Sequence, residues 1–508
     1  MDEMNLDMEL DLSKVGELNA PTQESAEIVA EPSQERYVAS TNPISNRAKN
    51  ERRRKKSKLQ IFKETTLPLI IIGIAIVLII VFIIGSITRG VQKRNVLKES
   101  SIAASSSLAA EEARQAAEAD AILKEAEVLA ASYDYDKAIA LIDTFSGNIG
   151  NFPQLQDARA RFEYGRTTLV VWEDPNTILN LSFQHLIADT ERAFASKEYS
   201  SSLKKNFVTI SEFQKILERL YANDYILVNL DDFIEVTTEG DATFYAYKEL
   251  YLPEDKKPLV LTQTNVNYNL YLVDSDKDLV ADKDGLGIAS RMVLDDNGNI
   301  TCEIVNSDGT TSVGAYDLVP ILDAFVAEHP DFSYKGAKAV LALTGYNGLF
   351  GYRTNASARA KLGEEQYASD VAAVQAIANR LTETGYELGC YTYGNSDFGK
   401  LSLANIQKEM TQWNDEVVPI LGNLDIMVFA QNSDIKDGIV YSGEKFDYLQ
   451  SLGFRFYLSF ANENQIFTFI SEDYVRQARL LVNGNNLKSN AKWFSDIFDT
   501  ENLLDESR

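Results

Sequence analysis

The sequence predicts an α/β domain of parallel strands, open or barrel-like, that follows a single transmembrane helix. Three observations support this class. An uncharged apolar run at residues 67–87 is long enough to cross a bilayer. Strand-like and helix-like segments alternate from about residue 176 onward, which is typical of parallel α/β domains. Of the 508 residues, 45% are apolar, so a sizeable core can be buried.

The run at residues 67–87, LPLIIIGIAIVLIIVFIIGSI, predicts both a membrane span and its orientation. As a helix it would extend about 30 Å, which matches a bilayer core. A cleavable signal peptide is not expected, because 66 residues precede the run and no A-x-A-like site follows it. Nine basic residues lie between Arg47 and Lys63, and only four between residues 88 and 100. The positive-inside rule therefore places the N-terminus in the cytoplasm and the C-terminal part outside.

Composition divides the rest of the chain into further segments. Residues 1–46 are acidic and interrupted by prolines, which predicts a disordered cytoplasmic tail that either folds on a protein partner or stays solvated. Residues 47–66 form a basic juxtamembrane segment. Residues 88–132 are rich in Ala, Glu and Ser and predict a helical stalk. Residues 133–170 predict a helical hairpin, a single tetratricopeptide-like unit. The α/β domain then spans 176–508.

The charge of the chain is concentrated outside the predicted span. Residues 1–100 carry a net +2, and residues 101–508 carry −28. A domain this acidic is repelled by nucleic acid and by anionic lipid surfaces. Neutral or cationic partners are expected instead, although solubility alone would also explain the charge.

The elements of the α/β domain follow one another in order. ILNLSFQHLI is strand-like, and VTISEFQKILERLYANDYILVNL is helix, turn and strand, with Thr209 or Ser211 as N-cap. KPLVLTQTNVNY predicts a strand that ends in a polar loop, and DDNGN at 295–299 predicts a hairpin. The remaining predicted elements are the strand AKAVLALTG, a helix and strand over residues 363–394, and the strands NLDIMVFA and FRFYLSF.

Neither the cysteines nor an acidic loop provides a strong metal or disulfide signal. Cys302 and Cys390 are too few for a disulfide framework, and buried thiols are favoured over a pair. The loop DSDKDLVADKDG at 274–285 has acids at calcium-loop positions 1, 3, 5 and 9. It has Leu279 at position 6 and Gly285 at position 12, where such a loop needs glycine and glutamate. A solvated acidic loop is the favoured interpretation.

Several segments taken in order resemble the polysaccharide deacetylase (NodB homology) family. They are LSFQHLI, VTISEFQKILERLYANDYILV, PLVLTQTNVN and the stretch around GYELGCYTYGN, and the resemblance covers roughly residues 176–508. It implies a (β/α) barrel with its chemistry on loops at the C-terminal ends of the strands. Membrane-anchored members act on peptidoglycan or other wall polysaccharides of Gram-positive bacteria. They use a divalent metal such as zinc, held by one Asp and two His, with a second Asp as base.

The family residues carry over to positions where the metal ligands and the base are replaced. Thr264 stands at the base and Asn265 at the metal-binding aspartate, in the loop after PLVLTQ. Tyr391 and Asn395 stand at the two histidines of the second motif. Neutral amide and phenol groups are weak zinc ligands. We therefore expect no metal and no catalytic residue at these positions.

The histidine count supports this expectation independently of the resemblance. The chain has two histidines, His185 and His329, and neither lies in an H-x-x-x-H spacing. His185 ends an apolar strand and His329 precedes Pro330 in a polar turn, so structural or surface roles are favoured for both.

Three functions remain open from the sequence. The first is a membrane-tethered, wall-facing protein without catalysis, whose cleft either binds cell-wall glycan or serves as a protein-docking surface. Candidate glycan-cleft residues are Tyr391, Tyr393, Asn395 and Asn265, and the alternative is that they only fill the space that a metal would occupy. The second is an active carbohydrate N-acetyl deacetylase or hydrolase that uses non-standard residues on peptidoglycan or another wall polysaccharide. The third is an envelope scaffold that links residues 1–46 to the wall.

Overall fold

The computed structural model describes residues 67–240, 242–276, 278–436, 438–461 and 465–508. The predicted tail 1–46 and the basic segment 47–66 lie outside these residues. The chain forms two compact units, residues 1–98 and 99–508, and the second unit contains the α/β domain.

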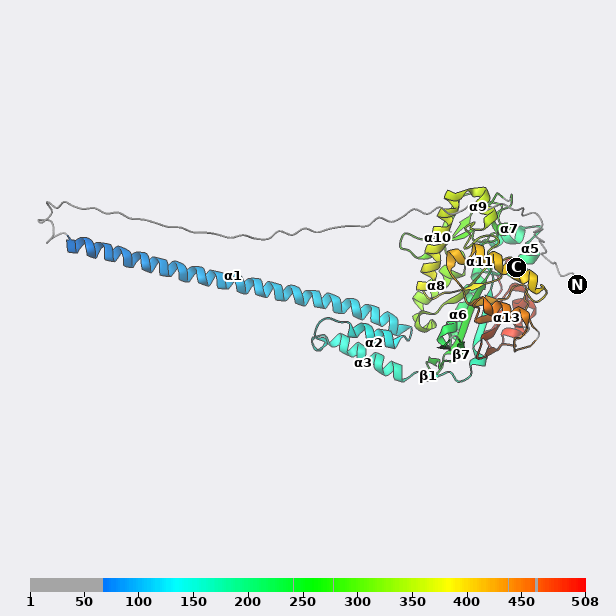
Figure 1. Ribbon diagram of the computed structural model, residues 1–508, viewed down its shortest axis with the longest axis horizontal. Helices are drawn as coiled ribbons and strands as arrows, with labels where there is room; N and C mark the ends of the chain where they lie inside the picture. Colours follow the sequence, from blue (N-terminus) through cyan, green and yellow to red (C-terminus); the bar gives the residue numbers. More distant parts are fainter. Residues whose placement is uncertain (1–66, 241, 277, 437, 462–464) are drawn as a thin grey trace. The chain divides into compact units, whose positions relative to one another are not determined.

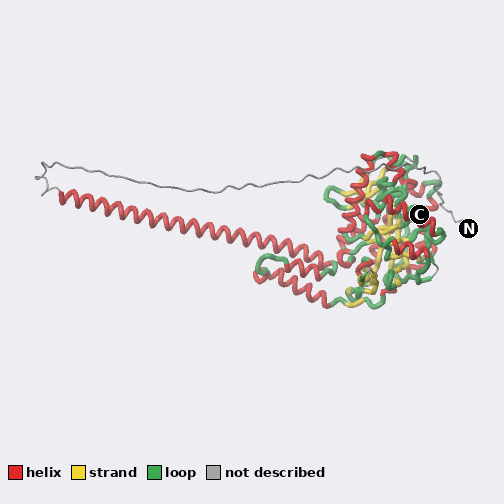
Figure 2. Tube along the Cα trace, in the orientation of Figure 1, coloured by secondary structure: helices red, strands yellow, loops and turns green. Residues whose placement is uncertain are grey.

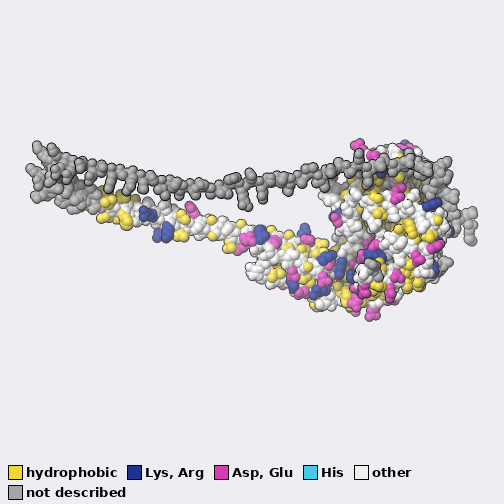
Figure 3. Space-filling view, viewed as in Figure 1, with side chains coloured by type: hydrophobic (Ala, Val, Ile, Leu, Met, Phe, Trp, Pro, Cys, Tyr) yellow, Lys and Arg dark blue, Asp and Glu magenta, His cyan; other side chains and the backbone are white. Residues whose placement is uncertain are grey.

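Helix α1 (Leu67–Ala131) is one continuous helix through the ranges predicted for the span and the stalk. Its part at Ile76–Ala131 includes a segment that is long and apolar enough to cross a membrane. No other helix among the described residues includes such a segment. Side chains such as Val77, Leu78 and Phe82 are exposed, as the hydrophobic cover near the start of α1 shows (Figure 3). An apolar surface of this extent needs a lipid or protein environment.

The end of α1 packs with two short helices, α2 (Tyr135–Asp143) and α3 (Pro153–Thr167) (Figure 1). Small residues on α1, including Ala119 and Ala126, allow the close approach of Ile142 and Phe162. Asp134 caps α2 by accepting a hydrogen bond from the Lys137 N–H. The three helices share one small hydrophobic core, which is separate from the cores of the α/β domain.

Seven parallel strands close into a barrel in unit 2. In spatial order they are β2 (Leu179–Phe183), β9 (Lys257–Thr264), β13 (Ala339–Leu343), β14 (Glu387–Cys390), β15 (Ile426–Val428), β16 (Phe456–Phe460) and β18 (Val475–Leu481). The pairing of β13 with β9 closes the ring, and all seven ring pairings are parallel. The predicted α/β class with a barrel of parallel strands is thus confirmed.

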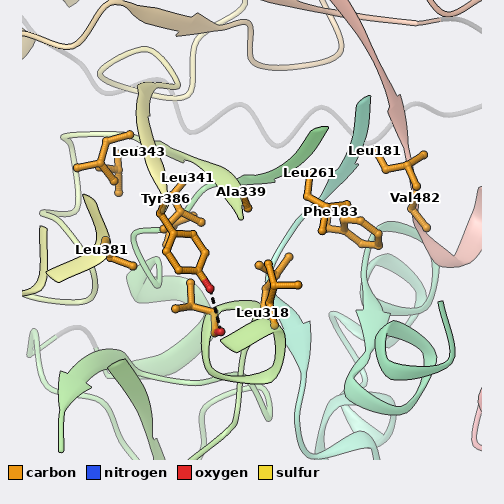
Figure 4. Close-up of a cluster of buried hydrophobic side chains, with 14 of the residues drawn as sticks. Leu181, Phe183, Leu261, Leu318, Ala339, Leu341, Leu343, Leu381, Tyr386 and Val482 are labelled. Atoms are coloured by element: carbon orange, nitrogen blue, oxygen red, sulfur yellow. Dashed lines mark hydrogen bonds between the residues drawn. The ribbon is translucent and has the colours of Figure 1, made fainter. Parts of the chain in front are cut away.

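Helices surround the barrel (Figure 2). The longer ones are α6 (Ile210–Ala222), α8 (Leu318–Glu328), α10 (Glu364–Glu383), α11 (Leu403–Glu416) and α13 (Glu444–Ser451); the shorter ones are α4 (Thr190–Ala195), α5 (Ser200–Asn206), α7 (Leu270–Val273), α9 (Ala356–Leu362), α12 (Val418–Leu421) and α14 (Gly484–Ser489). The core between barrel and helices is built from outward-facing strand residues such as Leu181, Leu261 and Leu341 (Figure 4). There the Tyr386 hydroxyl donates a hydrogen bond to the Val319 carbonyl, at 3.1 Å.

Short strands extend the barrel sheet or form small separate sheets beside it. They are β5 (Tyr225–Leu227) beside β9, β17 (Thr468–Ile470) beside β18, the pairs β1 (Val170–Val171) with β8 (Tyr251–Leu252), β3 (Leu186–Ile187) with β4 (Val208–Thr209) and β6 (Ile234–Glu239) with β7 (Ala242–Tyr247), and the meander β10 (Arg291–Leu294), β11 (Ile300–Val305) and β12 (Thr311–Gly314). The predicted hairpin at 295–299 joins β10 and β11, with Gly298 at φ +77° in its turn. Both cysteines are free and buried, as favoured from the sequence.

Helix α6 is fixed at its start by a capping box and by a buried ion pair. Thr209 and Glu212 cap each other's backbone N–H groups, which confirms Thr209 as the N-cap. The fully buried Glu212 carboxylate also accepts hydrogen bonds from the Arg508 guanidinium at 2.5 and 2.7 Å and from the Asp505 N–H at 2.9 Å. One carboxylate thus holds the segment around Arg508 against α6.

Replacing Glu212 should destabilise the domain strongly. Glu212→Ala leaves the largely buried Arg508 charge with the Lys204 and Phe207 carbonyls but without its carboxylate partner, and we expect the free energy of unfolding to fall by about 3–5 kcal/mol. Urea unfolding, followed through the fluorescence of the buried Trp413, measures this loss. Glu218→Ala on the exposed face of the same helix is the matched control and should change stability by less than about 0.5 kcal/mol. A loss for Glu212→Ala as small as the control's would contradict the buried-pair interpretation.

Glu387, at the start of β14, should make stability pH-dependent. Burial raises the pKa of its carboxyl from 4.5 to about 8, and nearby Asp231, Asp232 and Asp425 add to the rise. The folded state therefore keeps a proton that the unfolded chain releases. The stability from this proton is complete below about pH 4.5 and is lost as pH rises through about 8. Glu387→Gln should reduce the fall in the free energy of unfolding between pH 5 and 9, measured by urea unfolding at each pH. Glu365→Gln, at an exposed residue, should leave this pH dependence unchanged. The same pH dependence in the unsubstituted protein and both variants would refute the assignment.

Candidate functional site

The interior of the barrel is polar on the side formed by β2, β9 and β18, whereas the other strands contribute apolar side chains such as Ala342, Val428 and Leu458. Asn180 on β2 donates a hydrogen bond from Nδ2 to the Gln477 Oε1 on β18, at 2.7 Å, and accepts one from the Thr262 hydroxyl on β9, at 2.9 Å. All three side chains are buried. Side chains alternate between the two faces of a strand, so Ser182, Thr264 and Arg479, two residues further along, also point inward. They form the next layer, at the C-terminal ends of the strands.

Arg479 links three strand ends across this layer. Its Nη1 donates to the Ser182 hydroxyl at 2.8 Å, its Nη2 to the Phe429 carbonyl at 2.9 Å and its Nε to the Leu458 carbonyl at 3.3 Å. These partners belong to β2, to the loop after β15 and to β16. We call this end of the barrel, with Ser182, Thr264, Tyr391, Arg479 and the adjoining Asn265, Asn395 and Gln431, the barrel mouth.

The Arg479 charge is buried without a carboxylate partner. The side chain is 4% exposed, and within the part of the chain that the structure describes no Asp or Glu oxygen lies at ion-pair distance from it. Burial lowers the pKa of the guanidinium to about 10, although Tyr391 and the more distant Asp434 act in the opposite direction. Asp434 itself pairs with Arg476. The barrel mouth therefore carries a positive charge that neutral hydrogen-bond acceptors stabilise, among the described residues, without neutralising it.

Thr264 and Tyr391 meet at the barrel mouth. Thr264 is the last residue of β9, and its hydroxyl donates a hydrogen bond to the Phe183 carbonyl at 3.2 Å. Tyr391 directly follows β14, where its N–H donates to the Leu343 carbonyl at 2.6 Å. The Tyr391 phenol lies beside Thr264, Arg479 and the Gln431 backbone; burial raises its pKa, and Arg479 partly offsets this. The positions assigned to the base and to the first histidine are thus neighbours in space.

Asn395 joins this group through Gln431. Asn395 has φ +58° and Gln431 also has φ +58°, and the Gln431 side-chain amide donates to the Asn395 carbonyl at 3.1 Å. The loop that holds Asn395 is tied to α11, because Glu409 accepts hydrogen bonds from the Gly394 N–H at 2.7 Å and the Ser396 hydroxyl at 2.9 Å. Asparagine tolerates the left-handed conformation better than most residues, which suits this position.

Asn265 adjoins the barrel mouth and has an unused acceptor. It follows Thr264 with φ +66° and is 8% exposed. Its Oδ1 is buried, and no described residue donates a hydrogen bond to it. A buried polar atom without a partner is unfavourable unless a ligand or water satisfies it. Asn265 therefore has a buried hydrogen-bonding atom that a ligand could satisfy.

Tyr393 lies apart from the other candidate residues. Its ring packs against Gly345, and its hydroxyl donates a hydrogen bond to Glu416 on α11 at 2.9 Å. Tyr391 belongs to the core inside the barrel, and Tyr393 to the core between barrel and helices. Two residues that are neighbours in the motif are thus on different sides of the barrel wall, because the chain leaves its extended course at Thr392, where φ is +59°.

The residues of the barrel mouth do not fit a divalent metal. A zinc site needs charged carboxylates or basic ring nitrogens. The mouth offers a threonine hydroxyl, a carboxamide and a phenol whose pKa is raised by burial, next to a guanidinium. Among the described residues, one group of acidic side chains is arranged closely enough for a cation, Asp274, Asp276 and Asp282 in the acidic loop. Asp274 and Asp282 there accept hydrogen bonds from backbone N–H groups of their own loop.

Both histidines have structural roles, as favoured from the sequence. His185 is buried; its Nδ1 lies 3.0 Å from Asp317 Oδ2, and its Nε2 accepts a hydrogen bond from the Tyr268 N–H at 3.3 Å. Neither nitrogen is available to a substrate. The ring of His329 packs at a tilt against Tyr221 and Phe325, with centroids 4.4 and 4.7 Å away.

Arg479, Ser182 and Gln431 are the residues of the mouth that sequence reasoning missed. The strand that carries Arg479 was not predicted, because VRQARLL has two arginines and a glutamine in seven residues. A period-two pattern was nevertheless present. In LNLSF the polar residues alternate with leucines, which indicates a strand with one polar face, here the barrel interior. In LTQT and VRQARLL, Gln263 and Arg476 are also polar on the opposite face and obscure the alternation.

Comparisons with known proteins find one similar solved structure. No protein-family model matches the chain, and no curated protein does. Among solved structures the chain is similar to a Streptococcus pyogenes deacetylase, PplD, in complex with acetate, with a TM-score of 0.33 and 13% sequence identity. The similarity covers 61% of this chain and 94% of that one.

Proposed function

We propose that this protein is anchored in the bacterial membrane by α1 and binds an acetylated wall glycan at the barrel mouth without metal-dependent hydrolysis. The observation that carries the proposal is the buried Arg479, whose charge lies beside Tyr391 and Thr264, at positions that the family resemblance assigns to metal chemistry. The N-terminus is cytoplasmic and unit 2 is outside, on the basis of the basic residues before the span.

Electrostatics argues against a divalent cation at the mouth. A charge of +1 and a charge of +2 about 6 Å apart, at an effective dielectric constant of about 20, repel by about 5 kcal/mol. Family ligands would offset such a repulsion with negative charge, but Asn265, Tyr391 and Asn395 are neutral here. Without the metal, water is not activated at neutral pH, so hydrolysis loses its nucleophile.

The same residues suit an acetamido group. Three of the five N–H donors of Arg479 are used within the protein, so two remain for a ligand carbonyl. The free Oδ1 of Asn265 can accept a hydrogen bond from an amide N–H. The two residues thus complement both ends of an acetamide, the neutral group that distinguishes an acetylated glycan from a deacetylated, cationic one.

The proposal predicts binding without turnover. The full chain, purified in detergent, should contain no stoichiometric zinc and release no acetate from the tetramer of N-acetylglucosamine, yet bind it in isothermal titration calorimetry. Stoichiometric metal together with acetate release would overturn the proposal and favour the alternative of an active deacetylase.

Substitutions at the mouth should weaken this binding. We expect Arg479→Met to reduce affinity at the mouth at least about tenfold, because a charge-assisted hydrogen bond is lost. Gln431→Ala, at an exposed residue, tests the loop around Asn395 with less risk to folding and should also weaken binding. Arg380→Met on α10 is the matched control. Unchanged affinity in both mouth variants would contradict the assignment of the mouth as the binding site.

A further inference from the structure

A cavity lies at the other end of the barrel, between the α2–α3 hairpin and the N-terminal ends of the strands. It has a volume of about 830 Å³, within the range of ligand pockets, about 300–1,000 Å³. Tyr334 and Lys335, in its wall, precede β13, whereas Thr264 and Arg479 lie at strand C-terminal ends. We call it the junction cavity.

The walls of the junction cavity are held together by backbone contacts. The Lys335 N–H donates to the Ser132 carbonyl at 2.7 Å, at the turn that ends α1. The linker after α3 pairs as β1 with β8, Val170 opposite Leu252. The Trp172 N–H donates to the Leu250 carbonyl at 2.8 Å. The hairpin is thus fixed to the barrel on two sides of the cavity, which makes the cavity a built feature of unit 2.

Tyrosine is strongly enriched in the lining. Tyr133, Tyr135, Tyr247, Tyr251 and Tyr334 are five of its fifteen residues, whereas the whole chain has 24 in 508. The phenols of Tyr247 and Tyr251 donate to the Trp172 carbonyl and to Glu249. For the other three phenols, no described residue is a hydrogen-bond partner. Aromatic faces with free hydroxyl groups suit a ligand that has apolar and polar surfaces side by side.

The turn that ends α1 sets the position of the Tyr133 ring in this wall. Tyr133 has φ +64°, and the Asp134 N–H donates a hydrogen bond to the Leu129 carbonyl at 2.9 Å, as in the left-handed cap that commonly ends a helix. The turn places the ring edge-on to Tyr135, with centroids 6.4 Å apart.

The charges in the lining are nearly balanced. Four acidic residues, Asp136, Asp232, Glu235 and Glu249, face three basic ones, Arg166, Lys248 and Lys335. Asp136 and Arg166 pair at 2.9 Å. Acidic and basic side chains are also interspersed over the face of the molecule seen in Figure 3. Such a wall provides hydrogen-bond donors and acceptors but no strong field for a polyanion or a polycation.

The lining favours a sugar chain over a peptide. Only Leu169, Ile234 and Val236 are aliphatic, so the cavity lacks the apolar pockets that would select alternate side chains of an extended peptide. Sugar rings present C–H faces to aromatic rings and hydroxyl groups to carboxylates and phenols. We propose that the junction cavity binds an uncharged oligosaccharide of two or more rings. The inference extends the proposed function, because it assigns a second site for the same ligand class.

Calorimetric stoichiometry tests this inference. Titrating the full chain in detergent with the N-acetylglucosamine tetramer should give two equivalents. The double variant Tyr251→Ala/Glu235→Ala, at exposed positions of the wall, should lose one equivalent or weaken it at least tenfold. Val236→Trp, which fills the cavity from β6, should do the same. The control Tyr164→Ala/Glu239→Ala, at exposed positions outside the cavity, should keep both equivalents.

The experiment distinguishes failure of the cavity inference from failure of the proposed function at the mouth. If Arg479→Met removes an equivalent but both cavity variants keep the full stoichiometry, the cavity inference is overturned and the proposed function stands. If the cavity variants abolish all binding and Arg479→Met changes nothing, the mouth assignment fails and the cavity inference stands. Binding of an uncharged extended peptide at the cavity, with no displacement by the tetramer, would also overturn the inference.

Discussion

The buried guanidinium of Arg479 determines what the C-terminal end of the barrel can do. It donates hydrogen bonds to Ser182, Phe429 and Leu458 and so joins three segments that are far apart in sequence. A buried charge is tolerated only where hydrogen bonds replace its hydration. The polar layer beneath, Asn180, Thr262 and Gln477, continues this network into the barrel. An interior that was apolar on the β2, β9 and β18 side as well would not accommodate such a charge.

The guanidinium also changes the chemistry that the mouth supports. A metal ion at this end of a barrel supplies positive charge and an activated water, whereas Arg479 supplies the positive charge alone. Its hydrogen bonds hold it in place, so the charge can orient a ligand oxygen but offers no exchangeable position for a hydroxide. Thr264 and Tyr391 beside it are neutral and donate or accept single hydrogen bonds. This set of groups supports the proposed recognition without hydrolysis.

Local pattern predicted the elements of the fold, but contacts between distant segments could not be predicted. The N-cap at Thr209 and the helix and strand of 363–394 are encoded within a few residues, and the structure confirms them. Strand β18 was missed, because Arg476, Gln477 and Arg479 gain their partners only after the barrel closes. The motif around Tyr391 placed that residue at the mouth. The same motif also predicted Tyr393 at the mouth, but Tyr393 lies outside the barrel, because the positive φ of Thr392 changes the direction of the chain. A positive φ is rare for a β-branched residue, so the sequence did not predict it.

Zinc affinity with and without Arg479 tests most directly whether its charge excludes a metal. The variant Thr264→Asp/Asn265→Asp/Tyr391→His/Asn395→His restores the family ligands, and it can be made with Arg479 retained or with Arg479→Met. Zinc affinity is then compared by competition with a chromophoric chelator. A repulsion of about 5 kcal/mol predicts zinc binding about a thousandfold or more tighter when Arg479 is replaced. Equal zinc affinity in the two variants would contradict the claim that the Arg479 charge excludes a metal.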